Sequence, residues 1–439
     1  MRSEPVLFGA AVAVFVALSS PASAQDPEAS GGFSAKEGGV TFHAETVSRL
    51  DEGGVILNDV KVSRPETDGV IRIEALLLTS EDILGFTSGA CLRAPVSGEA
   101  VARGVRFRPD PDAHVPDAEN AEAVDIALVT LDVEMSGCGR SVSGPLDGIE
   151  VTGVDGSSFS FDGADVKVDL SGSGRVETRV DLVNGKVEDS EGGYAGFSFS
   201  EAGFSFQGDQ GEVTSLLSLL KAKDIEGFVL NLAHIDAGVG GYIRGMDVDT
   251  AKFLPDEDRS RLGLDDVEAI FGDFEVSMGV AQEQARMMTR FDAPGLAKGE
   301  AFLRFEVPRE KTVLPASVAD RLPLPASLLS VSLHRATVSY EDLGLGDVTE
   351  SATGRRPRDI LEDAGHDRVN KVVDRLPGGL GQAARSAWAA VLELADGKIS
   401  QVGLSPEGPV TLMQAGLSGF SGAGALASSV GAYKDDAPR

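Results

Sequence analysis

Residues 196–206 read GFSFSEAGFSF, in which the same GFSF box occurs twice. Within each box phenylalanine alternates with serine, as apolar and polar residues alternate in a strand that is buried on one face. The stretch SFSFDGADVKVDL at 158–170 repeats this alternation. Both stretches predict a mainly β fold with a long, twisted antiparallel sheet or groove. We expect four side chains to point to one apolar side and to be its ligand-binding residues: Phe197, Phe199, Phe204 and Phe206.

Short alternating runs continue through most of the chain and are separated by Gly, Asp or Pro. The 53 glycines and 6% aromatic residues fit many short strands joined by tight turns. No fixed repeat length can be written, which excludes a strict solenoid but leaves a β-helix open. We also expect short helices at 212–223 and 265–271, and strand-like structure at 227–249.

The first 24 residues have the pattern of a secretory signal peptide. An apolar run from Val6 to Leu18 is followed by the small residues Ala22-Ser23-Ala24, which form a cleavage site of the A-x-A type. No later window reaches the roughly 18 apolar residues that a membrane helix needs. We therefore expect a mature chain that begins at Gln25, has no transmembrane segment and lies in the periplasm, or alternatively is secreted.

The mature chain divides into parts of different composition. Two helices are predicted within 358–396, separated at Pro377-Gly378-Gly379. The expected parts are a flexible leader at 25–37, a β-rich sheet domain at 38–342, a helical cap with a closing strand at 343–412, and a flexible tail at 413–439.

Cys91 and Cys138 are the two cysteines of the chain, and both lie in its exported part. In an oxidising compartment such a pair is typical of a disulfide, which would add about 4 kcal/mol through loop closure. The alternative is two buried thiols. Neither cysteine has a neighbouring histidine, so the pattern does not indicate a zinc site.

Acidic residues outnumber basic residues by 69 to 39, which gives a net charge of −30. Such a surface repels nucleic acid and anionic head groups, so a nucleic-acid partner is not expected. The acidic stretches at 110–120 and 254–266 lack the spacing of an EF-hand. We interpret them as solvated loops, and calcium binding stays open.

No catalytic motif is found. The five histidines lie in five separate segments: His43, His114, His234, His334 and His366. The segment GLSGFSGAG at 416–424 has Phe420 where a nucleophile elbow needs glycine. We therefore expect no enzyme, no catalytic residue, no metal site and no cofactor. A carbohydrate-active enzyme with a β-helix fold is a weaker alternative, because one Trp and four Tyr offer few rings for stacking on sugars.

Two regions resemble known envelope proteins. Residues 38–79 resemble the OstA-like β-jellyroll repeat of lipopolysaccharide-transport proteins, although Asn58-Asp59 stand where that family usually has a glycine. Residues 332–347 and 398–412 resemble the closing part of AsmA-like proteins. This resemblance implies a periplasmic β-rich groove, in a family with several members implicated in phospholipid traffic. We expect the chain to differ from typical AsmA-like proteins in lacking an uncleaved membrane anchor.

These observations favour a non-catalytic envelope protein that binds or transfers a lipid or other amphiphile along an apolar sheet face. Too few helices are predicted to cover so many strands. The main alternative is a structural or interaction protein whose apolar face is an ordinary β-sandwich core, with an envelope protein as its partner.

Overall fold

The structure is a computed structural model. It describes residues 33–37, 40–51, 53–63, 69–79, 94–109, 123–153, 157–189, 193–209, 225–253, 256, 259–260, 264, 267–308, 330–373, 379–397, 399–411, 414 and 431–436. Within these ranges no helix combines the length and the apolar character that crossing a membrane requires. The predicted signal peptide lies outside the described residues.

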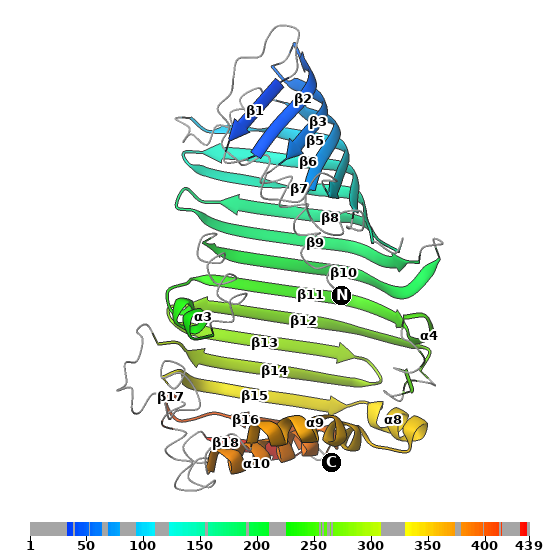
Figure 1. Cartoon of the computed structure of the whole chain (residues 1–439), viewed down its shortest axis with the longest axis vertical. Coiled ribbons are helices and arrows are strands. Elements are labelled where there is room, and N and C mark those ends of the chain that lie inside the picture. Colours follow the sequence, from blue (N-terminus) through cyan, green and yellow to red (C-terminus); the bar gives the residue numbers. More distant parts are fainter. Residues whose placement is uncertain are drawn as a thin grey trace. The chain divides into compact units, whose positions relative to one another are not determined.

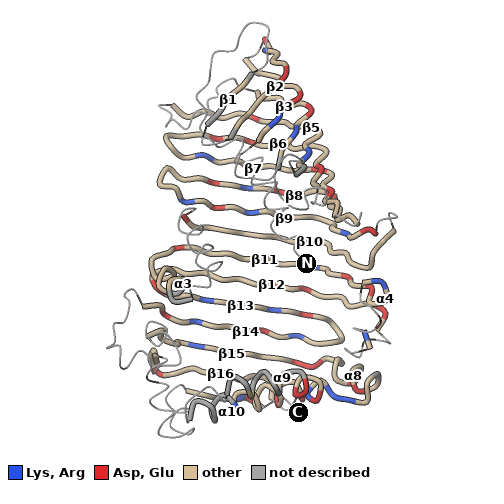
Figure 2. The backbone as a smooth tube through the Cα atoms, in the orientation of Figure 1, with Lys and Arg blue, Asp and Glu red and all other residues tan. Residues whose placement is uncertain are grey.

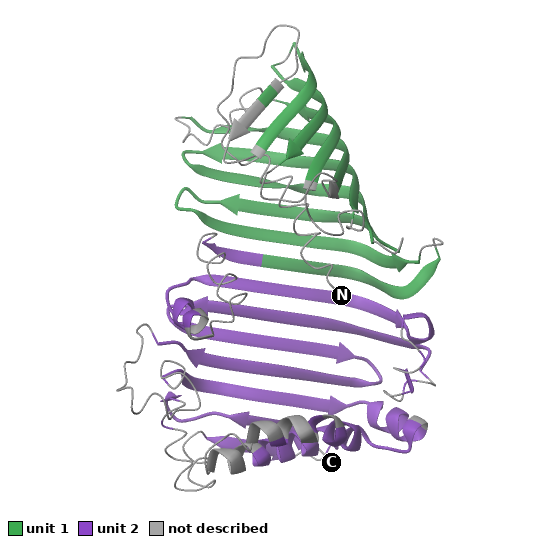
Figure 3. Ribbon diagram, in the orientation of Figure 1, with its two compact units in different colours: residues 1–205 green, residues 206–439 purple. Residues whose placement is uncertain are grey.

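The chain forms two compact units, residues 1–205 and residues 206–439 (Figure 3). The strands of unit 1 are β1 (Phe33–Glu37), β2 (Val40–Arg49), β3 (Val55–Ser63), β4 (Gly69–Leu78), β5 (Val96–Pro109), β6 (Ala123–Ser136), β7 (Gly139–Thr152), β8 (Ser158–Leu170), β9 (Arg175–Glu188) and β10 (Tyr194–Asp209). The boundary between the units falls within β10.

From β1 to β9 each strand pairs antiparallel with the next strand in the chain (Figure 1). Alternate side chains of these strands are buried and apolar, as period-two patterning requires. This confirms the predicted mainly β fold with a long antiparallel sheet. The predicted leader at 25–37 includes β1, whose backbone pairs with β2.

The alternation in unit 1 slips by one residue along a single row that crosses the sheet. In β3 the buried side chains Leu57 and Val60 are three positions apart, and in β6 the same holds for Ile126 and Val129. On each strand from β3 to β9, one residue at the slip lies opposite the corresponding residue of the next strand. We call this line the kink row, and its members are Asp59, Glu74, Gly104, Ala127, Gly148, Asp162 and Asn184.

Every second member of the kink row has a left-handed backbone: φ is 51° at Asp59, 61° at Gly104, 63° at Gly148 and 51° at Asn184. Glycine, aspartate and asparagine are the residues that adopt this conformation at least cost. The left-handed residue resets the alternation, so apolar side chains on both sides of the row reach the same core. This accounts for the left-handed backbone of Asp59 in the middle of β3.

Unit 2 contains α3 (Ile225–Leu232), β11 (Ala237–Asp249), α4 (Thr250–Phe253), β12 (Ala269–Ala281), β13 (Gln284–Ala293), β14 (Ala297–Glu306), β15 (Ser332–Asp342), α8 (Leu345–Thr353), α9 (Pro357–Val373), α10 (Gly379–Ala395), β16 (Ile399–Leu404), β17 (Val410–Thr411) and β18 (Ala432–Asp436). Strands β11 to β15 pair antiparallel in chain order, β15 then pairs with β16, and β16 pairs with β18. The predicted helix pair is confirmed by α9 and α10.

Three expectations differ from the structure of unit 2. The strand-like segment at 227–249 begins as the helix α3, because Leu232 at its end packs into a buried apolar cluster. The helix predicted at 265–271 is wrong for its last residues, since Ile270 lies in β12 and pairs with Val248 of β11. The predicted tail at 413–439 includes β18, which pairs with β16. The helix predicted at 212–223 lies outside the described residues.

Candidate functional site

The strand register of unit 2 separates its sheet into an apolar face and a polar face. Phe274 lies directly opposite Phe291, and Met278 lies directly opposite Met287. Because directly opposed residues point to the same side of a sheet, these four side chains share one face. The same face carries Val239, Ile243, Val276, Leu303, Val338 and Tyr340.

Six large side chains on the apolar face are open to solvent. They are between 36% and 43% exposed, and we call them the apolar strip: Val239, Phe274, Val276, Met287, Phe291 and Val338. They come from four strands, β11, β12, β13 and β15. Exposed apolar side chains on one sheet face make this strip a candidate interaction surface.

Helices cover the apolar face at its two sides. At the end of the strands near α3, the side chains of Leu232 and Ile235 form a buried cluster with Val280, Ala285 and Val307. At the other side α10 packs against β15 and β16, and Glu393 Oε2 of α10 lies 2.8 Å from Lys434 Nζ of β18. Among the described residues, no helix covers the apolar strip, which lies between the α3 cluster and α10.

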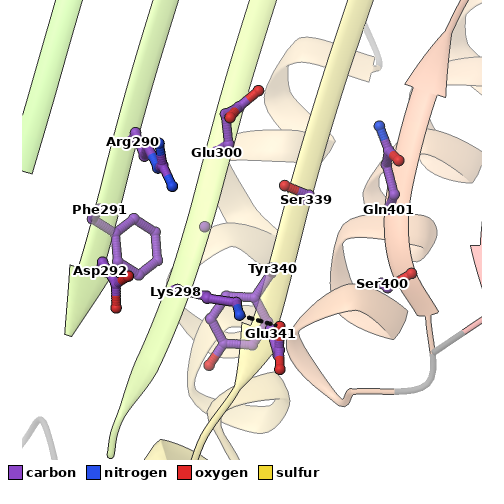
Figure 4. A pocket seen from close by; sticks show the side chains of 11 residues that line it. Arg290, Phe291, Asp292, Lys298, Glu300, Ser339, Tyr340, Glu341, Ser400 and Gln401 are labelled. Atoms are coloured by element: carbon purple, nitrogen blue, oxygen red, sulfur yellow. Dashed lines mark ion pairs between the residues drawn. The ribbon is translucent and has the colours of Figure 1, made fainter. Parts of the chain in front are cut away.

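The opposite face is polar and carries charges of both signs. Arg290 lies between Glu275 and Glu300 in the register, and Lys298 Nζ is 2.8 Å from Glu341 Oε2. Figure 4 shows Arg290, Glu300 and the Lys298–Glu341 ion pair lining a hollow of about 280 Å³. The charges around this hollow are matched by neighbours of opposite sign.

Tyr340 and Phe291, which belong to the apolar face, also line the hollow, so it is not confined to the polar face. Burial, together with the nearby Asp342 carboxylate, raises the pKa of Tyr340 to about 12. The phenol therefore stays protonated at neutral pH. Within the described ranges, no group of three or more His, Cys, Asp and Glu is placed to hold a metal ion.

The four phenylalanines predicted to bind a ligand all lie on β10. Phe197 and Phe199 of β10 join Phe159 and Phe161 of β8 in an aromatic cluster with centroid separations of 4.5 to 6.3 Å. Phe199 is only 5% exposed, so its ring serves the core of unit 1. Phe204 is half-buried.

Phe206 belongs to unit 2, whereas the other three predicted phenylalanines belong to unit 1. Its side chain is half-buried beside Gly208. The structure thus brings Phe197 and Phe199 together and assigns Phe206 to the other compact unit. Ligand binding by these four residues stays a prediction.

Other residues singled out in the sequence are dispersed. Cys138 lies in the turn between β6 and β7, and Cys91 lies outside the described residues, so the disulfide stays a prediction. His43 and His234 are exposed in different units, and His334 Nε2 lies 3.2 Å from Glu306 Oε2. His114 and the acidic stretch at 110–120 lie outside the described residues.

The apolar strip was not predicted as a site, although its sequence signal was present. The segments DFEVSMGVAQ at 273–282 and AFLRFEVPR at 301–309 alternate as clearly as the GFSF boxes. The alternation indicates an apolar face, but it does not indicate whether another element covers that face.

Comparisons with models of known protein families, with curated proteins and with solved structures found no match for this chain.

Proposed function

We propose that this chain binds a lipid or another amphiphile along the apolar strip of unit 2, without performing chemistry on it. The observation that carries the proposal is the exposure of six large apolar side chains on one sheet face. An acyl chain lying on them would remove apolar surface from water, which contributes about 25 cal/mol for each Å² covered. The predicted signal peptide and the resemblance to envelope groove proteins lead us to place this activity in the periplasm.

The composition of the strip favours a flexible apolar ligand. Met287 supplies an adaptable thioether side chain, while Phe274 and Phe291 supply flat ring surfaces directly opposite each other. A sheet face of this kind offers a continuous apolar floor rather than a closed pocket. It suits a ligand that is extended and has no fixed shape.

The alternatives make different demands on the fold. A carbohydrate-active β-helix would have parallel strands, whereas every described strand pair whose register is known is antiparallel. A structural or interaction protein would bury the apolar strip against a partner protein. That alternative predicts protein association and no bound lipid.

Lipid extraction of the purified chain, followed by mass spectrometry, tests the proposal together with the binding of a fluorescent fatty acid. Val276→Glu places a charge in the middle of the strip, and we expect at least a roughly ten-fold loss of affinity. Ser277→Glu is the matched control, because Ser277 is the next residue of β12 and points to the polar face. It should bind as the unchanged protein does.

Thermal unfolding followed by circular dichroism verifies that both variants are folded. Absence of lipid from the purified protein together with no binding of the fatty acid would overturn the proposal, as would equal binding by the Val276→Glu variant.

A further inference from the structure

Three arginines lie side by side on the polar face of unit 2, the face opposite the apolar strip. Arg286 of β13 is directly opposite Arg304 of β14, and Arg304 is directly opposite Arg335 of β15. Figure 2 shows basic positions on these three neighbouring strands. We call this set the arginine row. Directly opposed like charges destabilise a sheet unless something neutralises them.

The described residues do not supply that neutralisation. Among the described residues, no carboxylate lies within 4.0 Å of the guanidinium of Arg286, Arg304 or Arg335. The nearest carboxylate along β14 is that of Glu306, and its Oε2 lies 3.2 Å from His334 Nε2. Among the described residues, nothing cancels the positive charge of the row, which is therefore open to an anionic ligand.

The contacts that the row does make hold its guanidinium groups in place without cancelling their charge. Arg304 Nη2 donates a hydrogen bond to Gln284 Oε1, and its Nε is buried with no hydrogen-bond partner. The Arg335 guanidinium lies over the ring of Phe302, 5.8 Å from the centroid. These neighbours are neutral, and they pre-organise two of the three arginines.

Several other basic residues of the same unit have a carboxylate beside them. Lys298 pairs with Glu341 at 2.8 Å, and Arg356 Nε lies 3.0 Å from Glu350 Oε2. Arg290, on the same face and strand as Arg286, has Glu275 and Glu300 as its cross-strand neighbours. In a chain with a net charge of −30, three adjacent arginines without a carboxylate are an exception that calls for an anion.

We infer that the arginine row binds a multiply charged oxyanion of the phosphate or diphosphate class. Guanidinium groups bind such oxygens with paired, charge-assisted hydrogen bonds. Neighbouring strands are about 4.8 Å apart, so the row spans about 10 Å, which allows one diphosphate to contact more than one arginine. The row and the apolar strip are on opposite faces of the sheet, so this site is separate from the proposed amphiphile site.

Isothermal titration calorimetry of the full chain with inorganic diphosphate at low salt tests the inference. We expect binding that weakens at least ten-fold in Arg304→Gln and in Arg286→Gln. Arg286 is exposed, so the second variant removes a charge with little risk to folding. Arg290→Gln is the matched control, because it removes an exposed arginine from the same strand and face but outside the row, and it should bind as the unchanged protein does.

The phosphate could come from solution or from a lipid head group, and co-sedimentation separates the two sources. Phosphatidylcholine vesicles with and without a lipid that has a terminal phosphate provide the probe. Binding to the phosphate-bearing vesicles alone, lost in Arg304→Gln, would assign the site to a head group. The inference would be overturned if neither diphosphate nor the phosphate-bearing vesicles bind. It would also be overturned if Arg304→Gln and Arg286→Gln bind as tightly as the unchanged protein. Both outcomes are independent of what the fatty acid assay shows for the apolar strip.

Discussion

Gly185 of β9 is a position in unit 1 where a single added methyl group should have a large effect. It lies directly opposite Phe161 of β8, and a Cβ at this position would overlap the ring of Phe199. That ring cannot simply move away, because the Phe159 and Phe161 centroids lie 5.9 and 6.0 Å from its own. Gly185→Ala therefore forces the aromatic cluster to repack.

Overpacking of this kind costs about 1–3 kcal/mol. With a urea dependence of about 2 kcal/mol per M, the unfolding midpoint of Gly185→Ala should fall by about 0.5–1.5 M. Urea unfolding followed by far-ultraviolet circular dichroism measures this shift. The matched control is Gly139→Ala in β7, where the added Cβ meets its nearest atom, Ser136 O, at an ordinary 3.4 Å. Its midpoint should change little.

A double-mutant cycle identifies the cause. In a Phe199→Ala background the ring is absent, so Gly185→Ala should become nearly neutral. An equal loss of stability in both backgrounds would refute the argument that the ring occupies the space above Gly185. Unchanged stability of Gly185→Ala in the natural background would refute it as well.

Two further predictions concern unit 2. The pKa of Tyr340 is raised from 10.0 to about 12, so the stability linked to its neutral form is present below pH 10 and is lost as the pH rises toward 12. Urea unfolding at several alkaline pH values should show a smaller decline for Tyr340→Phe, and an identical decline would contradict the assignment. The Asp396 side chain is 6% exposed, and its Oδ1 lies 3.7 Å from Arg356 Nη1 while its Oδ2 lies 3.6 Å from Arg358 Nη1. Because these ion pairs hold the start of α9, Asp396→Asn should speed hydrogen exchange in the first turn of that helix. The exposed pair partner Glu350→Gln should leave that exchange nearly unchanged, and equal effects of the two variants would count against a special role for Asp396.

The strands of this protein could be predicted from sequence because period-two alternation is a local property. The kink row could not, because it depends on which residues lie opposite one another. Asp59 and Asn184 are far apart in the chain, yet both take φ of 51° in the same row. Read alone, each is an unremarkable polar residue within a strand. Only the register of the intervening strands shows that they perform the same function.

Some helices could be predicted from the sequence and others could not. The pair α9 and α10 could be predicted because Pro377-Gly378-Gly379 breaks a long helical segment. The short helix α3 has the sequence IEGFVLNL, an apolar run that fits a buried strand equally well. Its conformation is decided by the apolar cluster around Leu232 and Val280, which is a property of the folded unit.

The sequence also could not predict which apolar residues are exposed at the candidate site. Val166 and Val168 of β8 alternate with polar residues, as Phe274 and Val276 of β12 do, yet the first pair is buried and the second pair is open. Phenylalanine was the strongest signal in the sequence, but rings as large as Phe199 gain most from covering one another. The open surface is therefore built largely from less conspicuous residues such as Met287, whose exposure depends on where α3 and α10 end.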